Sequence, residues 1–127
     1  MRDRGMSLHW HGRWALQLWG YEPDVDGATE LLKRSFGPDG PITISLEVRA
    51  RSRIHAIVVA HGAGRLSAVF RCEQQGTGLQ PHRDLPTTTW EGSNRFTFDV
   101  PADAERIVLE IGPEDGAKAK LRFTVAT

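Results

Sequence analysis

The sequence predicts an all-β fold in which short antiparallel strands form a sandwich or a barrel. The chain has 127 residues, the size of one domain with one hydrophobic core. Apolar and polar residues alternate along residues 42–54 (ITISLEVRARSRI), which is the pattern of a half-buried strand. Further strand-like segments are separated by turns rich in Gly, Pro, Asn and Asp, a spacing typical of these folds. We therefore expect residues 1–127 to form a single β-rich domain.

The first predicted strand lies in residues 8–19 (LHWHGRWALQLW). Successive side chains of a strand point to opposite faces of the sheet, so alternate residues share a face. The inward face is predicted to hold Leu8, Trp10, Trp14, Leu16 and Leu18. The opposite face is predicted to hold His9, His11, Arg13, Gln17 and Trp19, and Tyr21 follows at the same parity.

The next segment, residues 26–36 (DGATELLKRSF), is ambiguous. It can form a single helical turn or a strand from Thr29 to Phe36, because it is too short for periodicity to decide. The predicted fold therefore contains at most one short helix, near residues 28–36.

Treated as one strand, residues 42–54 place Arg49, Arg51 and Arg53 together on the polar face. A later predicted strand, RLSAVFRCE, adds the outward-facing Arg71. Such a cluster can hold a carboxylate, a phosphate or an acidic protein partner through bidentate hydrogen bonds. The alternative is a solvent-facing surface whose cross-strand ion pairs contribute ~0.2 to 1 kcal/mol each.

The remaining predicted strands are IHAIVVAH, RLSAVFRCE, TTTW, RFTFDV, RIVLEI and AKLRFTV. Cys72 is the one cysteine of the chain, which excludes an internal disulfide and a multi-cysteine zinc site. At an inward strand position it is predicted to be a small core residue rather than a reactive thiol.

Charge and hydropathy argue against several classes of partner. The chain has 16 Lys and Arg residues against 16 Asp and Glu residues, so no overall field favours nucleic acid or an anionic membrane. No apolar run reaches the ~20 residues of a membrane span, and the amino-terminal stretch has no apolar run of signal-peptide length. We expect a cytoplasmic protein, or an extracellular one if this domain is cut from a larger secreted parent.

Two histidines near the amino terminus, His9 and His11, form a candidate metal site. Residues at i and i+2 of a strand project from one face and can share a metal ion. A working site needs a third ligand, and no other histidine or carboxylate has a spacing that implies convergence on this pair. We therefore predict no metal and no other cofactor, and a small metal-dependent β-barrel enzyme is an alternative.

The acidic turn EPDVDGATE carries Asp24, Asp26 and Glu30 around a glycine. Oxygen-rich loops of this kind can bind Ca²⁺, but the twelve-residue ligand pattern of an EF-hand is missing. A solvated turn is stable without an ion. The sequence favours the solvated turn and leaves calcium binding open.

Trp19 and Tyr21 stand among polar residues on the predicted outward face. An aromatic ring can stack beneath a sugar while amide, imidazole and guanidinium groups bind its hydroxyls. The candidate ligand-binding residues are Trp19, Tyr21, Gln17, His9, His11, Arg49, Arg51 and Arg71.

Near the carboxyl end, residues 90–123 read WEGSNRFTFDVPADAERIVLEIGPEDGAKAKLRF. An aromatic residue leads into a strand ending in F-x-V-P-A, followed by an acidic turn, a second strand, a Gly-rich turn and a last strand. This stretch resembles the closing strands of galactose-binding-like jelly rolls, including carbohydrate-binding modules and bacterial pre-peptidase C-terminal domains. The resemblance covers about the final third of the chain. It implies an antiparallel β-sandwich of jelly-roll type and a sugar ligand.

No nucleophile elbow, phosphate-binding loop, dinucleotide fingerprint or zinc-peptidase motif occurs in the sequence, so no catalytic residue is assigned. We expect a non-catalytic binding module that recognises a carbohydrate or another small polar ligand on a sheet face. Besides the metal-dependent enzyme, one alternative is open: a cytoplasmic protein-interaction or assembly domain whose arginine-rich strand face binds an acidic protein partner.

Overall fold

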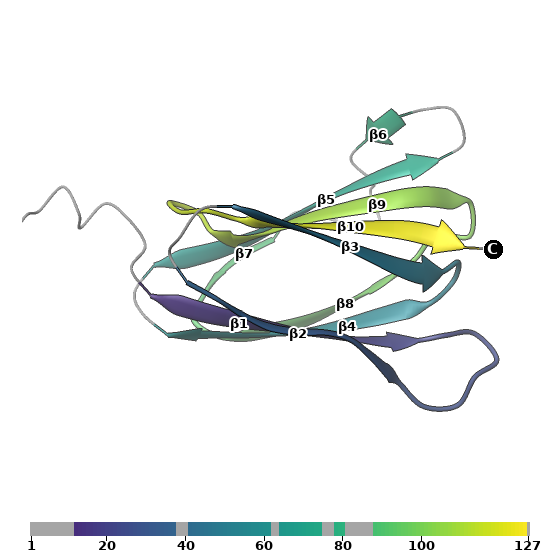
Figure 1. Ribbon diagram of the computed structural model, residues 1–127, viewed down its shortest axis with the longest axis horizontal. Coiled ribbons are helices and arrows are strands. Elements are labelled where there is room, and N and C mark those ends of the chain that lie inside the picture. The colour runs from purple at the N-terminus through teal and green to yellow at the C-terminus, as the bar shows by residue number, and fades with distance from the viewer. Residues whose placement is uncertain (1–11, 38–40, 62–63, 75–77, 81–87, 127) are drawn as a thin grey trace, which may run out of the picture.

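Two β-sheets lie face to face in the computed structural model, and the side chains between them form a hydrophobic core (Figure 1). The structure describes residues 12–37, 41–61, 64–74, 78–80 and 88–126. These residues form strands and connecting turns without a helix, which confirms the prediction of an all-β sandwich. The same part of the chain accordingly holds no helix that could cross a membrane.

Sheet A contains four strands in the order β2-β1-β4-β8, and each is antiparallel to its neighbours. Its strands are β1 (Arg13–Tyr21), β2 (Thr29–Phe36), β4 (Arg53–His61) and β8 (Asn94–Asp99). Buried residues alternate with more exposed ones along β1, as the period of two predicts. Trp14, Leu16 and Leu18 accordingly face the core.

Sheet B has the order β3-β10-β9-β5-β6, and β7 pairs with a part of β5 that β6 leaves free. Its strands are β3 (Ile42–Arg49), β5 (Arg65–Gln74), β6 (Gly78–Gln80), β7 (Thr88–Glu91), β9 (Ala104–Pro113) and β10 (Ala119–Ala126). The pairing of β3 with β10 is parallel, and the other pairs of this sheet are antiparallel. The sandwich is therefore mostly antiparallel.

Aromatic rings join the two sheets in the core. Phe98 of sheet A packs against Phe70 and Phe123 of sheet B, with ring centroids 4.8 and 6.0 Å apart. Trp14 stacks on Phe36 within sheet A at 4.3 Å. Edge-on and offset contacts at these distances are the favourable geometries for aromatic pairs. Cys72 is buried with them, at 2% exposure, so its predicted place in the core is confirmed.

The ambiguous segment near residues 28–36 is strand β2 and contains no helical turn. Leu18 of β1 pairs with Leu32, whereas the next residue, Trp19, pairs with Glu30. Leu31 is therefore an extra residue on β2, as in a β-bulge. The bulge also interrupts the alternation of apolar and polar residues in this short segment.

Residues 42–54 form two strands, which corrects the prediction of one. β3 ends at Arg49 in sheet B and β4 begins at Arg53 in sheet A, so the three residues between them carry the chain from one sheet to the other. The middle residue, Arg51, adopts a φ of 67°, the left-handed conformation typical of turns. Arg49, Arg51 and Arg53 therefore do not share a strand face.

Hydrogen bonds from distant parts of the chain hold this turn. The amide of Ala50 donates to the carbonyl of Ala126 at 2.9 Å, and the amide of Arg51 donates to the carbonyl of Val100 at 3.0 Å. More buried and more exposed residues still alternate from residue 46 to residue 54, although the chain changes sheets within this range. The reason is that successive side chains keep facing the core and solvent in turn. The apolar pattern therefore gave no sign of the break.

Candidate ligand-binding face

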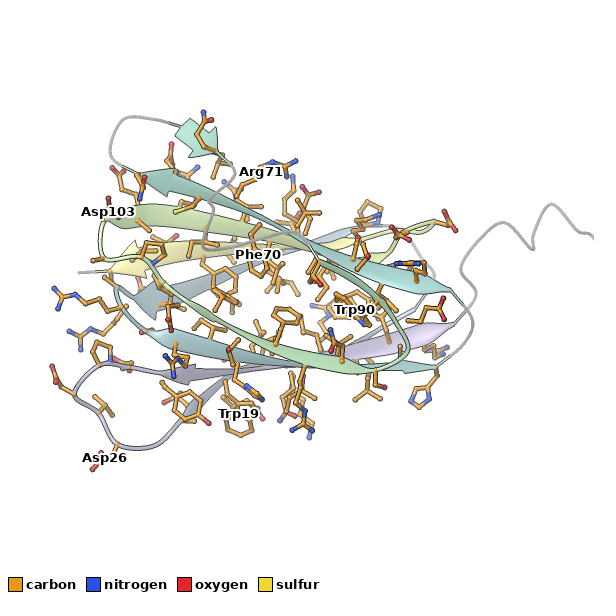
Figure 2. All side chains as sticks on the ribbon, turned by 180° about the vertical axis from the view of Figure 1, so that it is seen from behind. Trp19, Asp26, Phe70, Arg71, Trp90 and Asp103 are labelled. Carbon is orange, nitrogen blue, oxygen red and sulfur yellow. The ribbon has the colours of Figure 1, made fainter. Side chains whose placement is uncertain are left out.

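The outer face of sheet A carries the aromatic residues that the sequence placed away from the core. Gln17, Trp19 and Tyr21 lie at alternate positions of β1, opposite in direction to Trp14. Trp14 is 1% exposed, Trp19 is partly exposed and Tyr21 is 45% exposed. Figure 2 shows Trp19 pointing away from sheet B. The predicted grouping of these three residues on one face is confirmed.

Strand β4 brings polar side chains beside the two aromatic residues. Trp19 pairs with His55 and Tyr21 with Arg53, and directly opposed residues of an antiparallel pair have neighbouring side chains. Arg53 pairs in turn with Asp99 of β8, and its Nε donates to the Asp99 Oδ1 at 2.9 Å. This hydrogen bond and the carboxylate charge raise the pKa of Arg53 above its usual value. Arg53 is therefore cationic at any physiological pH.

Strand β2 supplies a polar group on the other side of Trp19. Glu30 is the β2 partner of Trp19 in the sheet register. Its Oε1 accepts a hydrogen bond from Gln17 Nε2 at 3.2 Å. Trp19 therefore lies between Glu30 on β2 and His55 on β4. Beside it, the amide of Gln17 is hydrogen-bonded to the carboxylate of Glu30.

Two shallow hollows lie on this face. One, with a volume of about 370 Å³, is lined by Tyr21, Glu22, Pro23, Arg51, Arg53 and Asp99. The other, of about 420 Å³, is lined by Ala15, Leu16, Gln17, Lys33, Arg34, Ser35, Ile57 and Val59. Tyr21 belongs to the first and Gln17 to the second, so Trp19 lies between them along β1.

The predicted arginines lie on different elements, although Arg51 and Arg53 line the same hollow. Arg49 lies at the end of sheet B, 3.4 Å from Glu22, and Arg51 in the turn lines the hollow that contains Tyr21. Arg71 lies on the outer face of sheet B, where its Nη1 is 2.7 Å from Glu110 Oε1. The candidate residues His9 and His11 lie outside the described residues.

One functional candidate, Asp99, was missed by the sequence reasoning. It is the outward-facing last residue of β8 and becomes part of the face because β8 pairs with β4. Alternation along RFTFDV gives its direction, but strand order was needed to place it beside Arg53. Sequence patterns do not give that order.

Potential metal ligands do not form a cluster in the part of the chain that the structure describes. No three His, Cys, Asp or Glu side chains gather there closely enough to hold a metal ion. Asp24, Asp26 and Glu30, considered above for calcium, belong to the residues that were searched. These three carboxylates do not form such a group.

No protein-family model matches the chain, and no curated protein matches it. The resemblance of residues 90–123 to galactose-binding-like jelly rolls therefore stays a prediction.

Proposed function

We propose that this chain is a non-catalytic binding module that holds a carbohydrate on the outer face of sheet A. The observation that carries the proposal is the exposure of Trp19 and Tyr21 side by side along β1, within a set of hydrogen-bonding side chains. Aromatic rings present flat apolar surface to the C–H face of a sugar.

The neighbouring polar groups suit the hydroxyls of a sugar. A carboxylate accepts hydrogen bonds and a guanidinium donates them in a fixed fork, so the Arg53–Asp99 pair offers both within 2.9 Å. Gln17 and Glu30 supply a second pair of amide and carboxylate. The opposite charges of Arg53 and Asp99 offset each other, which suits a neutral, hydroxyl-rich ligand beside that pair.

The two hollows on either side of Trp19 support binding of more than one sugar ring. A ring stacked on Trp19 would have one neighbour beside Tyr21 and another beside Gln17. We therefore expect oligosaccharides to bind more tightly than the corresponding monosaccharides.

A glycan array followed by calorimetric titration of the best glycan tests the proposal. Trp19→Ala and Tyr21→Ala should each weaken binding by about tenfold or more, as expected for central aromatic contacts. Arg71→Ala, on the outer face of sheet B, is the matched control and should leave the affinity unchanged. Absence of any glycan hit, or equal loss in the Arg71 variant, would contradict the proposal.

Salt dependence separates this proposal from binding of an acidic partner through arginines. Exposed charges are screened beyond ~8 Å at physiological ionic strength, so an arginine-led contact weakens as salt rises. A sugar held by stacking and neutral hydrogen bonds should show nearly the same affinity at low and high salt. A steep loss of affinity with salt would favour the interaction-domain alternative.

A further inference from the structure

Strand β8 (Asn94–Asp99) forms one edge of sheet A. The strands of this sheet follow the order β2-β1-β4-β8, so within the described residues β8 has a partner strand on one side only. The free side of an edge strand carries backbone N–H and C=O groups that can pair with another chain. This edge is therefore a possible contact surface for a second molecule.

The backbone groups at the free edge can be assigned from Val100, the residue that follows β8. Its amide donates to the carbonyl of Ser52 at 2.8 Å, and its carbonyl accepts from the amide of Arg51 at 3.0 Å, so both groups point toward the chain that leads into β4. In an antiparallel pair, every second residue directs both backbone groups to one neighbour, and the residues between them direct theirs to the opposite side. The groups that point to the free edge are therefore those of the outward-facing residues of β8, Arg95, Thr97 and Asp99.

The side chains of these three exposed residues are complementary to their own copies. Asp99 has Arg53 beside it on β4, whereas Arg95 has Ile57 beside it and no acidic partner among the described residues. When two β8 strands pair antiparallel with Thr97 opposite Thr97, Arg95 of each copy lies opposite Asp99 of the other. Opposite charges and paired threonines are both favourable in directly opposed positions of a sheet.

This register is the one that pairs the charges. With the two-fold axis at Phe96, Arg95 would lie opposite Thr97 of the other copy, and with the axis at Phe98 it would lie opposite Pro101. A shift that places outward residues opposite inward ones would separate the two polar faces. The Thr97-centred register also uses all the backbone groups that the edge presents.

Partly exposed aromatic rings lie on the inner side of the same edge. Phe96 of β8 and Trp90 of β7 are each only partly buried, and their ring centroids are 6.0 Å apart. In the Thr97-centred register, Phe96 of each copy lies opposite Phe98 of the other. Pairing therefore removes apolar surface from water in addition to forming backbone hydrogen bonds.

We propose that this chain forms a symmetric dimer in which the β8 strands of two copies pair antiparallel, with Thr97 on the two-fold axis. The two four-stranded sheets A then form one sheet of eight strands. Both outer faces lie on the same side of that sheet, because directly opposed side chains of paired strands share a face. The dimer is independent of the carbohydrate proposal, because it depends on the edge of the sheet and not on Trp19.

Sedimentation equilibrium of the full-length protein, from micromolar to millimolar concentration, tests the dimer. The wild type should change from monomer to dimer as concentration rises, and the dimer should weaken as salt screens the exposed ion pairs. Hydrogen exchange gives a second measurement without a variant. The amides of Arg95, Thr97 and Asp99 should exchange more slowly at high protein concentration than at low concentration. A monomer over the whole range, or exchange of these amides that does not depend on concentration, would overturn the dimer.

Two charge-reversal variants test the register. Arg95→Asp places two carboxylates opposite each other at both ends of the pairing, and Asp99→Arg places two guanidinium groups there. Each variant alone should raise the dissociation constant of the dimer by about tenfold or more. An equimolar mixture of the two variants again places an acid opposite an arginine at both ends, and it should form a heterodimer with nearly the wild-type affinity.

A matched control lies on the opposite edge of sheet A. Lys33→Asp reverses a charge on β2 and should leave the dimer unchanged. Circular dichroism shows whether each variant is folded. Because Arg95 has no ion pair to lose within the described residues, Arg95→Asp tests the register even if Asp99→Arg does not fold.

Three results with the folded variants would overturn pairing through β8. The first is a dimer of Arg95→Asp as tight as that of the wild type. The second is a mixture of Arg95→Asp and Asp99→Arg that associates no better than either variant alone. The third is loss of the dimer in Lys33→Asp, which would place the contact at β2.

Discussion

The outer faces of the two sheets differ in how much their outward-facing apolar side chains are exposed to solvent. On sheet A, Val59 is 40% exposed beside Ala15 of β1, on the outer face that also carries Trp19 and Tyr21. On sheet B, Val108 also points outward but is 5% exposed, between its strand neighbours Arg71 and Arg122. Long arginine stems commonly cover apolar surface of this kind.

The two outer faces also differ in their ion pairs. On sheet B, Arg71 pairs with Glu110 across β5 and β9, and Arg106 is 3.7 Å from Glu73 on the same two strands. Arg71 and Arg106 thus each have an acidic partner, whereas the outer face of sheet A presents Trp19, Ile57 and Val59 in addition to its Arg53–Asp99 ion pair. Much of the charge on sheet B is therefore engaged within the sheet, and the partly apolar outer face of sheet A is the better candidate for a ligand.

The largest expected effect concerns the two tryptophans of β1. Trp14→Ala should lower the free energy of unfolding by ~3 to 5 kcal/mol, because it removes a buried ring that stacks on Phe36. Trp19→Ala should cost about 1 kcal/mol or less, because Trp19 lies on the outer face. Urea denaturation monitored by circular dichroism measures both, and equal costs would mean that Trp19 is also a core residue.

The two outward-facing valines give the next effect. Val108→Ala should cost about 1.5 kcal/mol, since two buried methyl groups are lost. Val59→Ala should stay within about 0.5 kcal/mol. The same denaturation assay compares the two variants. If Val59→Ala proves as damaging as Val108→Ala, the outer face of sheet A is not open in solution.

A smaller effect is expected for the Arg71–Glu110 ion pair. A double-mutant cycle with Arg71→Ala and Glu110→Ala should give a coupling energy of about 0.2 to 1 kcal/mol, because both side chains remain partly exposed. The coupling should decrease as salt rises. A coupling near zero at low salt would remove the ion pair as a feature that distinguishes the two faces.

The smallest effect is a pH dependence on the inner side of sheet B. Burial, and to a lesser degree the charge of Asp103, raises the pKa of the Cys72 thiol. An unfolded thiol titrates near ~8.5, so the contribution of Cys72 to stability is complete below this pH and is lost as pH rises through the higher folded pKa. Between neutral and alkaline pH, wild type should lose more stability than Cys72→Ala. Identical alkaline losses would contradict the buried thiol.

The directions of the β1 side chains could be predicted because they depend on local geometry alone. Trp14 and Trp19 differ in parity, and a regular strand sends them to opposite faces whatever its neighbours are. The same reasoning placed Gln17 and Tyr21 beside Trp19. This part of the candidate site follows from the period of two.

Features that depend on distant contacts could not be predicted. The turn around Arg51 contains neither glycine nor proline, and its hydrogen bonds come from Val100 and Ala126. Asp99 reaches Arg53 through the pairing of β4 with β8. Nothing in the local pattern of either segment specifies its partner strand, so the arginines were assigned to one face and Asp99 was not considered.

The parallel pairing of β3 with β10 also sets an order on folding during synthesis. In the described part of the chain, β3 hydrogen-bonds to β10, the last strand, with Ile42 beside Ala119. A ribosome makes β3 long before it makes β10, so the backbone of β3 lacks its β10 partner until β10 has been made. Contacts so distant in sequence slow folding, and an unpaired strand is prone to pair with another molecule. We therefore expect β3 to be an unpaired edge until β10 has been made.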